Sequence, residues 1–461
     1  MNRILAVVLS FTFSSALCAQ QINLSAVSLT DLKGTPSSAS FPVPEPITPA
    51  GPTPEKEWTV MAFLNGKDSD GGLDTLAVQD LNRLAAIGSS EKINILAEVG
   101  IATFDLEHKA SYSVKRYHLK RSAALGDLSN STEYPLPLKV DMGDYKSVSD
   151  FIIWAQANFP AKRYIFIILG HGGGWMDPQS LTSKSVSPDS ETHSRISLAQ
   201  MKLMFTGTKG VDIYIGENCL MQMMEVAYEL APYVKIAIGS GEGLIENSSK
   251  NSQYNYEALV DKISQTSDIS TEGAAAYFID STYPSYTLHE DLWLTLSALR
   301  LDKTAGLLQR LDTWADAVMR SGDAPAVRKA WKDCLRFSWI QFTHAPYGDL
   351  YHFIELVTEN TTAPELKSLG SELMDYIKRQ FVLKNAAAGY RAQHNTETGA
   401  YMESDMARNS HGISINLPPI DLTWQWSLQT SYADTGFGKA GKWPVFCDWI
   451  RNITSQPPAT R

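Results

Sequence analysis

The 461-residue chain is 44% hydrophobic and contains 11 tryptophans, a composition typical of an ordered and well-packed protein. Its length exceeds what one simple core usually holds, so we expect one large elaborated domain or two domains. The net charge of −10 and the lack of a basic footprint exclude the nucleic-acid-binding class, because binding to phosphates requires clustered Lys and Arg.

The N-terminus has the layout of a secretory signal peptide. Arg3 precedes an apolar run over residues 4–13, and small residues lead to a cleavage position after Ala19. No later apolar stretch is long enough to span a bilayer, so we expect a protein without a membrane span that is secreted or periplasmic. The resulting division of the chain is residues 1–19 as signal peptide, 20–56 as a Pro/Ser-rich linker or pro-segment, 57–260 as catalytic core, and 261–461 as a C-terminal region that completes the fold.

The core is predicted to alternate strands and helices. In chain order we expect a strand over 59–64, a helix over 73–87, a strand over 93–99, a hairpin arm or edge strand over 111–119, a helix over 148–158, and strands over 164–169, 211–215 and 235–240. Beyond these lie expected helices over 257–278, 303–320 and 364–388 and strands over 291–299 and 412–417. This order predicts an α/β fold, with a mostly parallel sheet covered by helices on both faces.

Two of these strands end in reactive side chains. The run YIFIIL is followed by Gly170, His171 and three further glycines, and the run VDIYI is followed by Gly216, Glu217, Asn218 and Cys219. Continuous apolar runs bounded by glycine are typical of strands buried in a parallel sheet, where ligands bind beyond the carboxyl ends. We therefore expect His171 and Cys219 to meet at one edge as a thiol–imidazole pair.

Such a pair is the machinery of a cysteine peptidase. The imidazole of His171 takes the thiol proton of Cys219 and later protonates the leaving amine. The oxyanion of the tetrahedral intermediate requires two fixed N–H donors, for which the backbone of Gly172 and of Cys219 are the candidates. Taken singly, a structural histidine and an inert buried thiol are the better interpretations. Their joint position at two strand ends favours catalysis.

Other chemistries find less support. The His-Gly-Gly-Gly run also occurs as the oxyanion loop of lipase-type hydrolases, but the Gly-x-Ser-x-Gly pentapeptide that those enzymes need is absent. No His-x-x-x-His or Cys-x-x-Cys pair is present, so we predict no metal site and no cofactor. The acidic loop over residues 67–72 lacks the downstream glutamate of a calcium loop, and we interpret it as a solvated turn.

Removal of the signal peptide leaves three cysteines, an odd number that requires at least one unpaired thiol or a bridge between chains. The simplest arrangement keeps Cys219 as a thiol. Cys334 and Cys447 are then either two buried thiols or one bridge, and the sequence does not choose between these alternatives.

The chain resembles the clostripain-type family of cysteine peptidases. The matching segments are VMAFLNGKDSDGGLDT, PAKRYIFIILGHGGGW, ENCLMQMMEVAYELAPYVKIAIGS, GDLYHFIELV, GISINLP and FGKAGKWPVFCDWI. The resemblance implies a caspase-like α/β/α sandwich with an elaborated C-terminal region. It also implies a catalytic dyad of His171 and Cys219, with the N–H groups of Gly172 and Cys219 as the oxyanion hole.

The resemblance further implies an acidic pocket for Arg or Lys at the cleavage site. The family has Asp two residues before the cysteine, where this chain has Glu217, and a second acid downstream that has no counterpart in residues 251–256. Glu242 and Glu246 are the candidate substitutes, with an ordinary loop carboxylate as the alternative for both and as the favoured interpretation of Glu246. The predicted substrate-binding residues are therefore Glu217, Ser240 and Glu242, and the predicted partners are protein or peptide substrates.

The family often matures by cutting itself between the histidine and cysteine strands. The loop over residues 177–194 holds Lys184, with Arg195 after it, and an exposed loop with ordinary charges is the alternative. Two rival functions share the same residues. They are a catalytically silent caspase-like scaffold that binds a partner, and a transpeptidase that uses the same dyad.

Overall fold

The computed structural model describes residues 54–455 except 69–71, 123, 125, 177–185, 245–253, 267, 288–292, 338–346, 395–400 and 420–430. The signal peptide, most of the linker, Lys184 and Glu246 lie outside the described residues. Among the helices that are described, none combines the length and apolarity needed to cross a bilayer.

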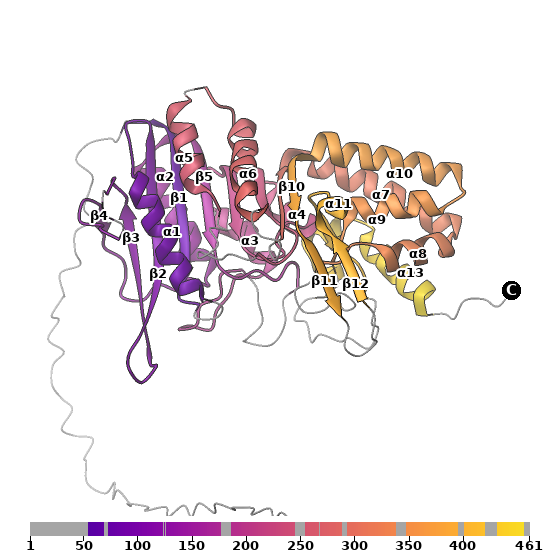
Figure 1. Cartoon of the computed structure of the whole chain (residues 1–461), viewed down its shortest axis with the longest axis horizontal. Coiled ribbons are helices and arrows are strands. Elements are labelled where there is room, and N and C mark those ends of the chain that lie inside the picture. The colour runs from indigo at the N-terminus through magenta and orange to yellow at the C-terminus, as the bar shows by residue number, and fades with distance from the viewer. Residues whose placement is uncertain are drawn as a thin grey trace, which may run out of the picture. The chain divides into compact units, whose positions relative to one another are not determined.

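A nine-stranded sheet organises the chain (Figure 1). Its strand order is β10-β8-β7-β6-β5-β1-β2-β3-β4. The strands are β1 (Lys56–Gly66), β2 (Ile93–Phe104), β3 (Ala110–His118), β4 (Thr132–Tyr134), β5 (Ala161–Leu169), β6 (Val211–Glu217), β7 (Val234–Ser240), β8 (Leu294–Arg300) and β10 (Val382–Ala388). The central strands β7, β6, β5, β1 and β2 run parallel. On each side the next strand, β8 or β3, runs antiparallel to them, and the edge strands β10 and β4 pair antiparallel with β8 and β3. The predicted α/β fold with a mostly parallel central sheet is confirmed.

Helices cover both faces of this sheet (Figure 1). The residues of β5 show why, because Tyr164, Phe166 and Ile168 alternate along the strand with Ile165, Ile167 and Leu169, and the two sets enter separate hydrophobic clusters. One cluster includes α1 (Leu73–Ile87), α5 (Tyr256–Gln265) and α6 (Thr271–Thr287). The other includes α2 (Tyr145–Asn158), α3 (Leu198–Met201) and α4 (Met224–Leu230).

The second cluster continues into the C-terminal helices without a break. These are α7 (Thr304–Ser321), α8 (Ala324–Asp333), α9 (Leu350–Asn360), α10 (Pro364–Tyr376), α12 (Gly436–Ala440) and α13 (Trp443–Ser455). The short helix α11 (Met406–Asn409) and two small antiparallel sheets complete the described α-helices and strands: β9 (Tyr347–Asp349) pairs with β13 (Ser414–Asn416), and β11 (Tyr390–His394) pairs with β12 (Tyr401–Asp405). Because β8 and β10 come from the C-terminal half and join the main sheet, that half and the core share one architecture.

Two expected helices differ from the structure. The helix expected over 257–278 is broken between α5 and α6, which separates it into two elements. The helix expected over 364–388 is correct through α10 but wrong at its end, where residues 377–381 form a π-helical turn and β10 follows. The Ala-rich segment of β10 favours a helix by propensity, but pairing with β8 at the sheet edge prevails over that weak preference.

Candidate active site

The register of β5 and β6 brings the two predicted reactive residues to one edge. Leu169 pairs with Glu217 at the carboxyl ends of these parallel strands, and His171 and Cys219 each follow two residues later. Asn218 fastens the two turns together, because its side-chain Nδ2 donates to the carbonyl oxygen of Gly170 at 2.8 Å and to that of His171 at 3.3 Å. The structure therefore places His171 and Cys219 on adjacent, interlocked turns.

Gly172 shows how closely these turns approach. A Cβ atom at this position would lie 2.2 Å from the carbonyl oxygen of Cys219 and 2.8 Å from the side chain of Met221. No side chain fits in that space, so the turn after His171 requires glycine here. On the other turn, Leu220 adopts a left-handed conformation with φ of 61°, a strained geometry for a branched residue. The chain accepts this geometry at the position directly after Cys219.

Cys219 is partly exposed, whereas Cys334 and Cys447 are buried, and none of these three described cysteines forms a disulfide. The sequence leaves two alternatives open for Cys334 and Cys447, and the structure has two buried thiols rather than a bridge. Burial raises the pKa of Cys334 to about 12 and raises that of Cys447 as well. The backbone N–H of Leu244 donates to the sulfur of Cys219 at 3.3 Å, and a donor in this position stabilises a thiolate.

An aspartate that the sequence interpretation missed lies against the histidine. Asp68 Oδ2 is 3.6 Å from His171 Nε2, and the side chains are 6% and 12% exposed. The interpretation of this loop as a solvated turn is wrong for Lys67 and Asp68, which are both buried. Asp68 follows the end of β1, so the rule that identified His171 and Cys219, a polar residue just past a parallel strand, also applies to it.

Glu217, the acid expected in the substrate pocket, is buried and engaged with other protein groups. Its Oε2 accepts a hydrogen bond of 2.5 Å from the Tyr256 hydroxyl, and its carboxyl also bonds to that of Asp80. Burial, followed by the nearby Glu217 charge, raises the pKa of Asp80 well above its usual range. Arg83 pairs with Asp80 at 3.0 Å and with Glu257 at 2.5 Å, so a guanidinium of the chain already lies beside these carboxyls.

Ser240 and Glu242 support the turn that carries Cys219. The carbonyl of Glu242 accepts from the N–H of Leu220 at 3.2 Å, and Ser240 exchanges a 2.8 Å hydroxyl hydrogen bond with Thr295. The carboxylate of Glu242 accepts from the N–H of Gly243 at 2.8 Å, and this side chain is fully buried. The structure thus brings both predicted residues next to the Cys219 turn, with Ser240 at the end of β7 and Glu242 two residues later.

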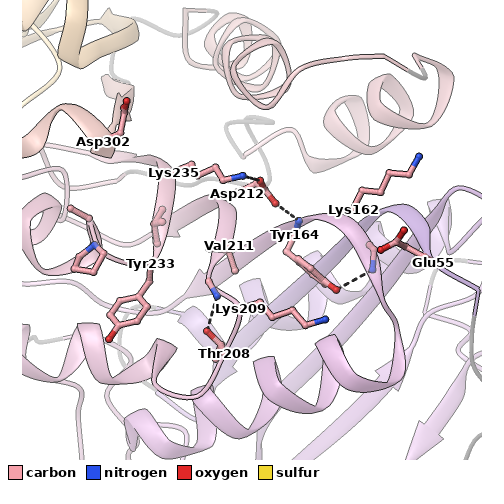
Figure 2. Close-up of a pocket in the computed structure, with 15 residues that line it drawn as sticks. Glu55, Lys162, Tyr164, Thr208, Lys209, Val211, Asp212, Tyr233, Lys235 and Asp302 are labelled. Carbon is pink, nitrogen blue, oxygen red and sulfur yellow. Dashed lines mark hydrogen bonds and ion pairs between the residues drawn. The ribbon is translucent and has the colours of Figure 1, made fainter.

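A separate pocket of about 730 Å³ lies at the opposite edge of the sheet (Figure 2). It is formed at the amino ends of β5, β6 and β7. Asp212 lies in its wall and accepts from the backbone of Tyr164 at 2.8 Å and from the Lys235 ammonium at 2.7 Å, as Figure 2 shows. None of its lining residues belongs to the turns of His171 and Cys219, so it is not part of the thiol site.

Comparison with known proteins identifies relatives of the whole folded part. A sequence model of the clostripain family matches residues 67–445. Clostripain from Hathewaya histolytica is 19% identical over 432 residues, which cover 81% of this chain and 79% of that protein.

Solved structures show the same fold. A secreted C11 cysteine protease from Bacteroides thetaiotaomicron, in complex with an irreversible peptide inhibitor, superposes with a TM-score of 0.56 at 14% identity, over 86% of this chain and 99% of that one. An inactive zymogen C11 protease from Parabacteroides distasonis gives 0.55 at 16% identity, over 84% and 99%. The expected caspase-like α/β/α sandwich is confirmed. Because the family match spans most of the chain, the chain belongs to the clostripain family of cysteine peptidases.

Proposed function

We propose that the chain is an exported cysteine endopeptidase in which Cys219 is the nucleophile and His171 is the general base and acid. The observation that carries this proposal is the interlocking of the two strand-end turns, where Gly172 lies against the carbonyl of Cys219. No other described cysteine is partly exposed at this edge, and the N–H of Leu244 is directed at its sulfur.

The reaction follows from these positions. His171 accepts the Cys219 proton, and the thiolate attacks the substrate carbonyl carbon, forming a C–S bond while the carbonyl electron pair moves to oxygen. The N–H groups of Gly172 and Cys219 stabilise that oxyanion. His171 then protonates the amine as the C–N bond breaks, and a water molecule deprotonated by His171 hydrolyses the acyl-enzyme and restores the thiol.

For substrate choice we propose that a basic P1 side chain, as the family resemblance implies, pairs with Glu242 rather than with Glu217. Glu217 already accepts from Tyr256 and shares a hydrogen bond with Asp80, and Arg83 lies in the same cluster. Glu242 lies two residues before Leu244, whose backbone N–H donates to the Cys219 sulfur.

Peptides that differ only in Arg, Lys, Asn or Leu at P1 test this assignment. We expect Glu242→Gln to reduce the ratio of Arg to Leu cleavage about tenfold or more, and Glu217→Gln to change it by less than about threefold. A wild type without any preference for Arg or Lys contradicts the proposal of a basic P1, and a larger effect of Glu217→Gln contradicts the choice of Glu242.

The catalytic assignment is tested by labelling with a peptidyl acyloxymethyl ketone. We expect the wild type to be labelled once, at Cys219, and the variants Cys219→Ala and His171→Ala to lose labelling. Hydrolysis of a folded protein substrate, followed by mass spectrometry of the products with and without an added amine, then separates an endopeptidase from a transpeptidase. Labelling that persists in Cys219→Ala rejects the assignment.

Export is tested by the N-terminal sequence of the protein recovered outside the cytoplasm. We expect it to begin at Gln20 or later, because residues 1–19 are removed on export. Recovery of a chain that still begins at Met1 contradicts this part of the proposal.

A further inference from the structure

Asp68 is the carboxylate that faces the catalytic histidine. Its Oδ2 lies 3.6 Å from His171 Nε2, and both side chains are largely withdrawn from water. A separation of 3.6 Å is beyond hydrogen-bond range, so the contact becomes an ion pair when the imidazole is protonated. β1 and β5 are parallel neighbours that pair at Leu64 and Leu169, so Asp68 follows the end of the strand beside the one that carries His171.

A buried lysine fixes the backbone next to Asp68. The Lys67 ammonium is 2.8 Å from Asp189 and 2.7 Å from Glu191, and it donates to the carbonyl of Val140 at 3.0 Å. The Lys67 side chain is 1% exposed. Three contacts on a buried cation hold this position firmly, so the neighbouring carboxylate of Asp68 has little freedom to turn away.

The same loop is fastened to the segment that contacts His171. Asn65 accepts from the N–H of Lys67 at 3.0 Å and donates to the Ser187 hydroxyl at 3.0 Å and to the carbonyl of Pro188 at 2.7 Å. The N–H of Ser187 donates to the carbonyl of His171 at 3.3 Å. Asp68 and His171 are therefore held by one continuous network, from the end of β1 to the segment after the histidine turn.

We propose that Asp68 is a positioning residue for His171, which rests on the proposed role of His171 as general base. Asp68 keeps Nε2 of the ring toward itself, so the proton exchange with Cys219 occurs at Nδ1. When the thiol proton moves from Cys219 to Nδ1, the carboxylate of Asp68 stabilises the resulting positive charge without accepting a proton. The proton then leaves with the amine, and Asp68 stays ionised throughout.

The test uses two readouts, peptide hydrolysis and alkylation of Cys219 by iodoacetamide, in which the thiolate displaces iodide. The buried Cys334 and Cys447 do not compete, because burial raises the pKa of both thiols. We expect Asp68→Asn to lower kcat about 10- to 100-fold with little change in KM. This loss of kcat is smaller than the roughly 10⁴-fold loss caused by neutralising an aspartate that is hydrogen-bonded to a triad histidine. We expect its alkylation profile to move about one pH unit upward, and Asp68→Glu to recover part of both losses.

A double-mutant cycle separates positioning from a structural role. If Asp68 acts through His171, Asp68→Asn shifts the alkylation profile in the wild type but not in the His171→Ala background. Equal shifts in the two backgrounds, or no shift in either, overturn the proposal. Asp74→Asn, which removes a carboxylate from the first turn of α1, is the matched control and is expected to leave both readouts unchanged.

Thermal unfolding confirms that each variant is folded. If Asp68→Asn does not fold, Asp68→Ser carries the same cycle. Alkylation does not require peptide hydrolysis, so a wild type that is inactive on peptides rejects the proposed function, while the cycle still decides whether Asp68 acts on His171.

Discussion

Asp68 and Glu217 are two buried carboxylates at the same edge of the sheet, but they serve different neighbours. Asp68 faces the imidazole of His171, whereas Glu217 bonds to Tyr256 and Asp80, in a cluster that contains Arg83. Glu217 is only two residues from the proposed nucleophile Cys219, and Asp68 is far from both proposed catalytic residues in sequence. For these two carboxylates the direction of the side chain, toward the imidazole of His171 or toward the helix layer, thus determines the neighbours more than distance along the chain does.

The largest expected effect comes from Gly172→Ala, which disrupts the approach of the His171 turn to the Cys219 turn. The new Cβ would lie 2.2 Å from the carbonyl oxygen of Cys219, so the two turns must separate. We expect kcat/KM to fall about 1000-fold, because small misplacements of catalytic groups are costly. Gly273→Ala in α6, whose Cβ would meet the Ser270 hydroxyl no closer than 3.2 Å, is the control. Activity within about tenfold of the wild type in Gly172→Ala contradicts the close approach of the turns.

The second largest effect is expected from Arg83→Met, which disrupts the cluster around Glu217. It removes the cation that lies among Asp80, Glu217 and Glu257 and leaves buried carboxyls uncompensated. We expect a loss of about 3 kcal/mol in the free energy of unfolding, measured by urea denaturation. Arg300→Met, which removes an ion pair with the half-exposed Glu272, should cost less than about 1 kcal/mol.

The activity of folded Arg83→Met shows whether the cluster around Glu217 affects catalysis as well as stability. We expect kcat of folded Arg83→Met to stay within about threefold of the wild type, because its cluster faces the helix layer rather than His171. A loss of kcat as large as that of Asp68→Asn, at unchanged stability, contradicts the separation of the two clusters.

Glu217→Gln has a smaller effect that depends on pH. The pKa of Asp80 is raised well above its ordinary value of 3.8, so the folded state retains a proton that the unfolded chain releases. The unfolded state then binds fewer protons, and stability falls as the pH rises through the window above 3.8. Removing the Glu217 charge should make this fall shallower by about 1 kcal/mol between pH 5 and pH 8, measured by urea denaturation at both values. A steeper fall in the variant contradicts the coupling between the two carboxyls.

The smallest effect is expected from self-cleavage near Lys184, which we propose from the position of the loop between the histidine and cysteine strands. Past this loop, Val186 pairs with Ile196, and Asp189 holds the buried Lys67. A cut should therefore leave the segment after it in place and change the unfolding temperature by less than about two degrees. Mass spectrometry of the wild type and of Cys219→Ala checks the cut itself, and a cut that persists in the variant contradicts self-processing.

Much of the fold follows from the sequence, because the apolar runs of β5 and β6 have few alternatives to a buried parallel strand. That same pattern brings His171 and Cys219 to one edge. Asp68 was missed because a short polar loop resembles a solvated turn, and its burial depends on the ion cluster of Lys67 with Asp189 and Glu191, over a hundred residues away. The engagement of Glu217 with Asp80 was equally hidden, since it depends on the approach of a side chain on α1 to the end of β6 in the folded chain rather than on any local pattern.

The burial of Cys334 and Cys447 has a consequence for redox chemistry. Thiol–disulfide exchange requires a thiolate with access to its partner, and burial denies both conditions to these two side chains. The described part of the fold is thus stabilised by its hydrophobic core and contains no disulfide. Oxidants or reductants should therefore alter the oxidation state of Cys219 while leaving the fold unchanged.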